Sequence, residues 1–306
     1  MKMLIRATAT ILAMLCGAIT ASAQSDDSIH ADVVYGHKAG MALTLDVFTP
    51  AEANGAAVLN MVSGGWVSRW TAPQQARTRY QPLLNAGFTV IAVRHGSSPR
   101  FKVPEAYADV NRAVRFVRLH AARFGIDPDR LGVYGGSAGG HLSLMLGLDS
   151  DQGDPEATDE VMRISSRVAA VVAYYPPVDL RQRATPSQDY PATLPDRGLF
   201  FAGGVVAPGA ADRFVALEFE AELGASVSPI LHVSADDPPT LLVHGDADAL
   251  VDLNNSQLIH ESFKRNGVKT ELVIIEGAGH GFRSEEHRSQ ASAALVAWFE
   301  NHLGGH

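Results

Sequence analysis

The chain has 306 residues, a formal net charge of −8 and 46% hydrophobic residues. This length suits one large α/β domain or two modest domains, and a composition near the globular average excludes disordered, collagen-like and coiled-coil chains. The acidic balance argues against a nucleic-acid binder, and the single cysteine, Cys16, excludes a disulfide framework and a cysteine metal cluster.

The first 23 residues have the order of a secretory signal peptide. Two basic residues flank the start, an uncharged apolar run follows, and Ala21-Ser22-Ala23 supplies small residues for cleavage. The apolar run is short for a membrane-spanning helix, and no later stretch is long and apolar enough to span a bilayer. We therefore expect cleavage near Ala23, a secreted or periplasmic protein, and a single thiol-free domain over residues 24–306.

After this segment, short apolar runs alternate with segments of helical periodicity. Apolar runs without polar alternation are typical of strands that are buried on both faces of a parallel sheet. We expect strands at residues 42–48, 57–62, 88–93, 131–134, 168–175, 240–244 and 272–275. We expect helices at residues 73–85, 104–121, 138–148 and 284–302. Repeated strand–helix units predict a mostly parallel sheet with helices on both faces.

Residues 176–229 interrupt this alternation. The segment is rich in proline, glycine and charge, and Phe200 and Phe201 lie near its middle. We interpret it as a cap-like insertion over the carboxyl ends of the strands and not as a second domain. Loops on that edge of an α/β sheet usually shape the ligand site, so we expect this insertion to influence the choice of substrate.

A serine lies on a tight turn between the predicted strand at 131–134 and the predicted helix at 138–148. The run from Gly135 to Gly140 contains G-x-S-x-G, and this motif requires a strand before it and a helix after it. Small flanking residues let neighbouring backbone approach, and the helix N-terminus favours negative charge near the hydroxyl. We predict that Ser137 is a nucleophile. The alternative, a phosphate loop, lacks the lysine that such a loop needs.

A serine nucleophile needs a base, and the α/β-hydrolase order is serine, acid, then histidine. His280 is the candidate base, because it lies in a glycine-rich loop between a predicted strand and a predicted helix. We expect His141, four residues into the helix after the serine, to have a packing role. We expect His244, at the end of a strand, to be buried and hydrogen-bonded. The acid should follow the same strand, where spacing leaves Asp246 and Asp248 as close rivals.

The sequence resembles the α/β-hydrolase esterases of the bifunctional feruloyl and acetyl-xylan esterase group, relatives of the hormone-sensitive-lipase-like esterases. The residues that carry this resemblance are Ile126–Arg130, Gly135–Leu142, Asp237–Pro239, His244–Asp248 and Gly279–His280. The resemblance spans nearly all of the chain after residue 23 and implies an eight-stranded, mostly parallel sheet of the α/β-hydrolase fold. It also implies that Asp248, the later aspartate of the H-G-x-x-D loop, is the triad acid and that Asp246 shapes the loop.

The oxyanion pattern of that family, H-G-G-G-W, is altered in this chain. The corresponding run is Val62-Ser63-Gly64-Gly65-Trp66, so a valine replaces the histidine and a serine replaces the first glycine. The donors of such a hole are backbone N–H groups, so these side-chain changes need not abolish it. By position Gly65 is the expected donor, with Ala138 completing the hole. The sequence leaves open which of Gly64, Gly65 and Trp66 points inward.

Several side chains near these loops are candidates for substrate contacts. Trp66, Tyr174, Phe200 and Phe201 could line an acyl or aromatic pocket, with ordinary core or loop packing as the alternative for each. His95 lies where many relatives carry Tyr-Arg, and it could touch the site. A structural loop histidine is the favoured interpretation of His95.

These features predict a secreted serine carboxylesterase that acts through Ser137, His280 and Asp248 and an acyl-enzyme. The expected substrates are short acyl, acetyl or feruloyl esters, either small molecules or esters linked to a polysaccharide. We expect no cofactor, no metal, no nucleic-acid partner and no membrane span. The alternatives are a peptidase of the prolyl-oligopeptidase type and a catalytically inactive hydrolase fold that serves as a binding protein.

Overall fold

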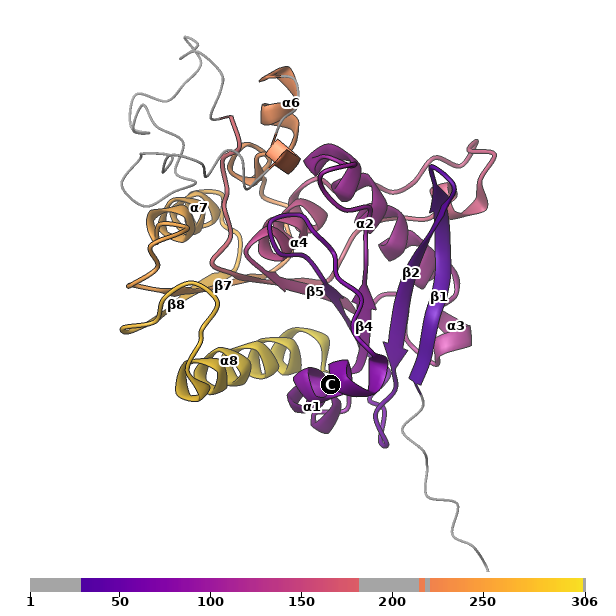
Figure 1. Ribbon diagram of the computed structural model, residues 1–306, viewed down its shortest axis with the longest axis horizontal. Helices are drawn as coiled ribbons and strands as arrows, with labels where there is room; N and C mark the ends of the chain where they lie inside the picture. The colour runs from indigo at the N-terminus through magenta and orange to yellow at the C-terminus, as the bar shows by residue number, and fades with distance from the viewer. Residues whose placement is uncertain (1–28, 182–214, 218–220, 305–306) are drawn as a thin grey trace, which may run out of the picture.

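The computed structural model describes residues 29–181, 215–217 and 221–304, and they form one α/β assembly (Figure 1). The strands are β1 (Ile29–Lys38), β2 (Met41–Phe48), β3 (Ala57–Met61), β4 (Thr89–Val93), β5 (Leu131–Gly136), β6 (Ala170–Tyr174), β7 (Thr240–Gly245) and β8 (Thr270–Ile275). The α-helices are α1 (Pro73–Asn85), α2 (Val103–Leu119), α3 (Ala121–Phe124), α4 (Ala138–Leu148), α6 (Ala221–Ser226), α7 (Asn254–Arg265) and α8 (Glu285–Leu303). Short 3₁₀ turns are η1 (Glu160–Arg163), η3 (Val215–Leu217) and η4 (Pro229–Leu231).

All eight strands belong to one sheet in the order β1-β2-β4-β3-β5-β6-β7-β8. The pairs β1–β2 and β2–β4 are antiparallel, and the remaining pairs from β4 to β8 are parallel. The expectation of a mostly parallel eight-stranded sheet is therefore confirmed. The parallel strands are joined by helical crossovers, which carry the carboxyl ends of neighbouring strands to one edge of the sheet.

The helices cover both faces of the sheet and enclose two apolar cores. Helices α2, α4 and α7 pack on one face, and α1 and α8 pack on the other (Figure 1). Strand β3 shows why both faces need cover, since Leu59 contributes to the first core and Val58 to the second. Its five residues are all buried, as expected for an apolar run without polar alternation.

Strand β1 was not among the predicted strands. Its register against β2 shifts between His30 and Val33 and again between Val34 and Gly36. These irregularities break the two-residue alternation on which strand prediction depends. Strand β1 lies at the edge of the sheet, so it changes the outline of the fold and not the position of the loops at the carboxyl ends of the parallel strands.

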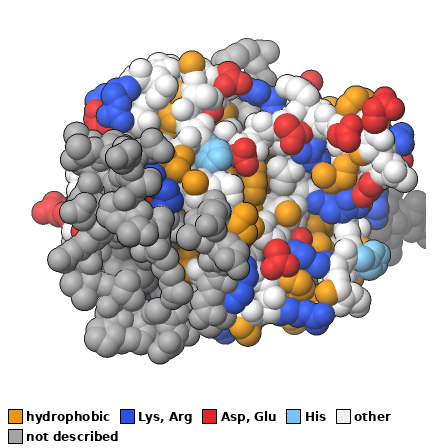
Figure 2. Space-filling model, turned by 90° about the horizontal axis from the view of Figure 1, so that it is seen from above, with side chains coloured by type: hydrophobic (Ala, Val, Ile, Leu, Met, Phe, Trp, Pro, Cys, Tyr) orange, Lys and Arg blue, Asp and Glu red, His pale blue; other side chains and the backbone are white. Residues whose placement is uncertain are grey.

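The described end of the 176–229 segment packs close to the carboxyl edge of the sheet. Turn η4 contacts α4 and α7, and Ile230 donates a backbone hydrogen bond to Val178 at 3.1 Å. The predicted signal peptide, Phe200 and Phe201 lie outside the described residues. Among the helices in the described ranges, none has the length and hydrophobicity needed to cross a membrane. Figure 2 shows basic and acidic side chains interspersed over the part of this face not drawn in grey.

Candidate active site

Ser137 lies on a strained turn between β5 and α4. Its backbone has φ 55° and ψ −120°, a conformation that a residue with a side chain rarely adopts. Ser137 N–H donates to the Tyr174 carbonyl at 2.9 Å, and the Ser137 carbonyl accepts from His141 N–H at 2.9 Å. The turn is thus tied to β6 on one side and continues into the helix on the other, which holds the strained conformation in place.

The glycines around Ser137 allow strand, turn and helix to touch. A Cβ atom at Gly139 would lie 2.5 Å from the Met61 carbonyl oxygen, and one at Gly140 would lie 2.9 Å from that of Tyr174. A Cβ at Gly135 would overlap the backbone of Gly139. Any larger residue at these three positions would push the turn away from the sheet, which explains the small-residue run seen in the sequence.

Asp248 and His280 meet at the carboxyl edge of the sheet. His280 Nδ1 lies 2.8 Å from Asp248 Oδ2, and the two side chains are 21% and 1% exposed. The other carboxylate oxygen, Oδ1, accepts the backbone N–H groups of Leu250 at 2.9 Å and Val251 at 3.0 Å. Burial alone would raise the pKa of Asp248, but hydrogen bonds from His244, His280 and Val251 hold it well below its usual range. Asp248 is therefore a charged acceptor at neutral pH.

A second histidine faces the same carboxylate. The fully buried His244 places Nε2 2.9 Å from the Val251 carbonyl and 3.5 Å from Asp248 Oδ2, while its Nδ1 lies 2.7 Å from Ser256 Oγ. Because two oxygen acceptors face Nε2, that nitrogen carries the proton, and the Ser256 hydroxyl donates to Nδ1. The buried, hydrogen-bonded role expected for His244 is confirmed, and its contact with Asp248 was not foreseen.

The loop of Asp248 and the loop of His280 are packed directly on each other. Ala247 N–H donates to the Ala278 carbonyl at 3.1 Å, and Gly277 N–H donates to Asp246 Oδ1 at 2.6 Å. A Cβ at Gly245 would overlap the Ala278 carbonyl. Asp246 thus ties the two loops together from an exposed position, while Asp248 points inward to the histidine.

Tyr175 links this pair to the serine turn. Its ring centroid lies 4.6 Å from that of His280, and a Cβ at Gly136 would lie 2.7 Å from its hydroxyl oxygen. Burial and the nearby charge of Asp248 raise the pKa of Tyr175 to about 12, so the phenol stays neutral. Tyr175 was missed in the sequence, although its place directly after a buried strand was a usable signal.

The run proposed as the oxyanion loop forms a two-residue turn. Gly64 and Val67 exchange two backbone hydrogen bonds of 3.1 Å, and the central residues, Gly65 and Trp66, have φ of 58° and 55°. Positive φ at both central positions is the pattern of a type I′ turn. The Gly64 N–H is occupied by Val67, so Gly64 is wrong as an oxyanion donor, and Gly65, Trp66 and Ala138 remain the candidates.

The Trp66 side chain points into the core and not toward a ligand. It is 1% exposed, and its Nε1–H donates to His141 Nδ1 at 3.4 Å. The other nitrogen of His141, Nε2, donates to the Val227 carbonyl at 2.7 Å, and burial lowers the pKa of His141 to about 4. The expected substrate contact by the Trp66 side chain is therefore wrong, because the left-handed backbone turns the indole toward α4. The packing role of His141 is confirmed.

His95, two residues after the end of β4, contacts the loop that contains Trp66. Its Nδ1 lies 2.8 Å from the Gly96 carbonyl and its Nε2 2.8 Å from Ser63 Oγ. The carbonyl can only accept, so Nδ1 carries the proton and the Ser63 hydroxyl donates to Nε2. Burial lowers the pKa of His95, which keeps this arrangement neutral. His95 is thus a structural loop histidine that holds Ser63, as favoured from the sequence, and it reaches the oxyanion loop without lining the adjoining cavity.

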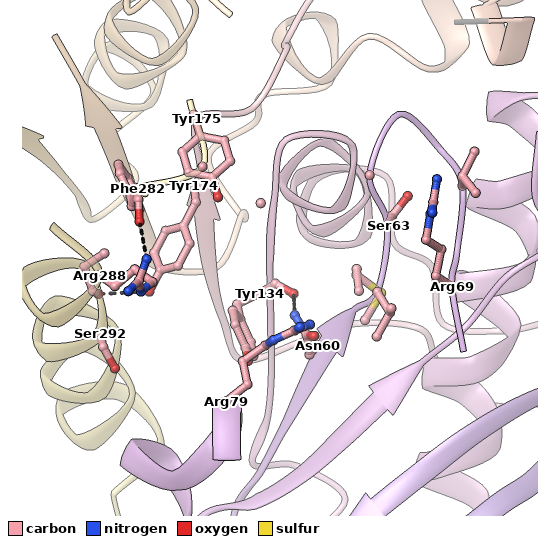
Figure 3. Close-up of a pocket in the computed structure, with 17 residues that line it drawn as sticks. Asn60, Ser63, Arg69, Arg79, Tyr134, Tyr174, Tyr175, Phe282, Arg288 and Ser292 are labelled. Carbon is pink, nitrogen blue, oxygen red and sulfur yellow. Dashed lines mark hydrogen bonds between the residues drawn. The ribbon is translucent and has the colours of Figure 1, made fainter. Parts of the chain in front are cut away.

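A cavity of about 530 Å³ adjoins these loops (Figure 3). It is bordered by Ser63 of the oxyanion loop, Gly136 before the serine, and Gly281 after the histidine. Tyr174 lines it, as expected, although its hydroxyl is engaged with the Ala291 carbonyl at 2.9 Å. No cluster of side chains suited to holding a metal ion occurs within residues 29–181 and 221–304.

A known protein family matches this arrangement of strands and loops. The family model called BD-FAE matches residues 45–263, a span that contains Ser137 and Asp248 and ends before His280. The chain belongs to the BD-FAE family. The matched span begins within β2 and contains β3 to β7 and the serine turn, while β8, His280 and α8 follow it.

Individual BD-FAE-like relatives carry esterase names. The protein named "Probable carboxylic ester hydrolase LipM" from Mycobacterium tuberculosis is 32% identical over 231 residues, which cover 74% of this chain and 49% of LipM. The chain spans about half the length of the curated relatives it matches.

Two solved structures are also similar. A truncated carbohydrate esterase from gut microbiota has a TM-score of 0.71 and 25% identity, covering 92% of this chain and 99% of that one. Thermogutta terrifontis esterase 2 phosphonylated by sarin has a TM-score of 0.70 and 28% identity, covering 92% and 96%. These similarities support an α/β-hydrolase fold of the esterase type.

Proposed function

We propose that the protein is a serine carboxylesterase. Its main support is the 2.8 Å hydrogen bond between Asp248 and His280 next to the strained serine turn. Further support is that the similar proteins and structures carry esterase names. The order serine, aspartate, histidine along the chain is the order that α/β-hydrolases use.

In the proposed mechanism the Ser137 hydroxyl attacks the ester carbonyl and His280 Nε2 takes its proton. Asp248 holds the proton of His280 at Nδ1, which leaves Nε2 free to act as a base, and it stabilises the imidazolium that forms. The oxyanion accepts hydrogen bonds from the backbone N–H groups of Ala138 and of Gly65 or Trp66. His280 then returns the proton to the leaving alcohol, and water hydrolyses the acyl-enzyme by the same route.

The substrates we propose are esters of short acyl groups, with acetyl and feruloyl groups as the first to test. The residues 176–229 are proposed as a cap-like insertion that selects among them. We propose that residues 1–23 are a signal peptide and that the enzyme acts outside the cytoplasm, where polysaccharide-linked esters are accessible.

Turnover of an ester panel by the wild type and by Ser137→Ala tests this function. The panel contains p-nitrophenyl acetate, methyl ferulate and acetyl-xylan, and the matched control is Ser143→Ala, a buried serine that bonds the Gly139 carbonyl inside α4. We expect Ser137→Ala to lower kcat at least ~10⁴-fold and Ser143→Ala to retain turnover. Substantial turnover by pure Ser137→Ala protein, or cleavage of peptide anilides in place of esters, would refute the proposal.

A further inference from the structure

Three arginines line the cavity next to the serine turn. Arg69 follows the oxyanion loop, Arg79 lies on α1 and Arg288 lies on α8. Among the described residues no aspartate or glutamate lines this cavity, although the chain has 33 acidic residues against 25 basic ones. A lining whose charged residues are all cationic is the reverse of what the acidic composition of the protein predicts. A positively charged cavity raises the local concentration of anions.

Some of the other arginines in the described residues pair with carboxylates. Arg94 pairs with Asp46, Arg115 with Asp151 and Arg181 with Asp179. Others, such as Arg118 and Arg130, bond backbone carbonyls. None of the three cavity arginines forms an ion pair with a carboxylate among residues 29–181 and 221–304. Arg288 donates instead to the backbone carbonyls of Phe282, at 3.4 Å, and of Arg283. Neutral carbonyls orient its guanidinium without cancelling its charge.

Two of these arginines lie beside polar and aromatic side chains of the cavity wall. Figure 3 shows the guanidinium of Arg79 beside Asn60 and that of Arg288 beside Tyr174. Between them run the rings of Tyr134 and Tyr174, both of which line the cavity. Burial raises the pKa of both phenols above the ordinary value, so neither ring supplies a negative charge. Two guanidinium groups on the neighbouring helices α1 and α8, with neutral aromatic walls, have the chemistry that binds a carboxylate.

The cavity also borders the loops that carry the groups that would react. Its border includes Ser63, Gly136 and Gly281, which come from the oxyanion loop, the serine turn and the histidine loop. An ester whose carbonyl lies at Ser137 can therefore extend a charged group toward α1 and α8. We propose that the preferred substrates are esters that carry a carboxylate and that Arg79 and Arg288 bind it. This proposal rests on the esterase function proposed above and names its substrate class.

Matched ester pairs test this proposal. In the acyl pair, the p-nitrophenyl half-ester of glutarate is compared with p-nitrophenyl valerate, since a carboxylate replaces the terminal methyl group. In the alcohol pair, para-acetoxybenzoate is compared with para-tolyl acetate for the same reason. The quantity measured is the ratio of kcat/KM for the charged ester to that for the neutral ester. Comparison of the two pairs shows which part of the ester carries the charge.

We expect Arg79→Gln combined with Arg288→Gln to lower this ratio about tenfold in at least one pair. Rising ionic strength should lower the wild-type ratio as well, since these arginines are exposed and salt screens exposed charges. The matched control is Arg265→Gln, which removes the same charge from the end of α7 on the other face of the sheet and should leave the ratio unchanged. Thermal unfolding midpoints show that the variants are folded.

A ratio that the double substitution leaves unchanged in both pairs overturns the proposal. Calorimetric binding of the glutarate half-ester to Ser137→Ala protein supplies a readout that does not depend on turnover. Binding should weaken about tenfold when both arginines are replaced, and equal binding would also overturn the proposal. A wild type that hydrolyses neutral esters without charge preference contradicts only this inference. A wild type that hydrolyses no ester contradicts the proposed function itself.

Discussion

Replacement of Asp248 by asparagine tests whether Asp248, and not Asp246, is the triad acid. In the wild type, Asp248 Oδ1 accepts two backbone N–H groups and Oδ2 accepts His280 Nδ1–H. An asparagine has one acceptor oxygen, so one of these ends must face an NH₂ group. If the NH₂ group faces His280, Nδ1 must become the acceptor and Nε2 then carries the proton. In that tautomer His280 cannot take the proton of Ser137.

The other orientation is also unfavourable, because the NH₂ group then faces the N–H groups of Leu250 and Val251. Two donors without an acceptor in this buried place cost about 1–3 kcal/mol each. We therefore expect the histidine-facing orientation, a fall in kcat of ~10⁴-fold with little change in KM, and a loss of about 1–3 kcal/mol in unfolding free energy. Steady-state kinetics on p-nitrophenyl acetate and urea denaturation measure these quantities.

Asp246→Asn is the matched control, since it makes the same chemical change two residues away. Asp246 is exposed and accepts one N–H group from Gly277, a role that an amide oxygen can fill. We expect kcat to change less than about threefold. If Asp248→Asn keeps kcat within tenfold of the wild type, or if Asp246→Asn is the more damaging substitution, the assignment of the acid is wrong.

Three further predictions concern the supporting residues. The pKa of His141 in the folded protein is about 4, below its value in the unfolded chain. Its contribution to the unfolding free energy is therefore complete above pH 6.5 and is lost as the pH falls toward 4, by about 3 kcal/mol in total. Urea denaturation at several pH values should show this fall in unfolding free energy, and His141→Phe should flatten it. Ser63→Ala removes the hydroxyl that donates to His95 and should lower kcat about threefold to tenfold without changing KM, whereas an unchanged kcat would show that the pair does not position the oxyanion loop. Gly139→Ala places a Cβ 2.5 Å from the Met61 carbonyl and should abolish esterase turnover or folding, and a fully active variant would contradict the close packing of the serine turn.

Much of the fold could be predicted from local patterns. The apolar runs at β3, β4, β5 and β7 are buried on both faces of the sheet, so their sequences lack the polar alternation that marks exposed strands. Strand β1 was not predicted, because its bulges break the alternation of buried and exposed side chains. Strand prediction from local sequence relies on a regular two-residue alternation of buried and exposed side chains, and an irregular edge strand does not keep that alternation.

In the candidate site, too, features that depend on neighbouring residues could be predicted, and features that depend on tertiary packing could not. Ser137 was predictable because its strained turn needs glycines that are adjacent in sequence. The choice between Asp246 and Asp248 could not be made from spacing, because it depends on how the loop folds against residues 277–280, about 30 residues away. The direction of the Trp66 side chain depends on a positive φ that the residue type does not predict. The cationic cavity was not predicted from the sequence, because Arg69, Arg79 and Arg288 come together only in the folded chain.

The account depends most directly on Ser137 as the nucleophile, and covalent labelling tests this. Purified protein is treated with a fluorophosphonate ester, and the modified residue is identified by mass spectrometry of its peptides. The proposed mechanism predicts one label per chain, on Ser137, with none on Ser137→Ala and much slower labelling of Asp248→Asn. An unlabelled wild-type protein, or a label on a serine away from the turn between β5 and α4, would contradict it.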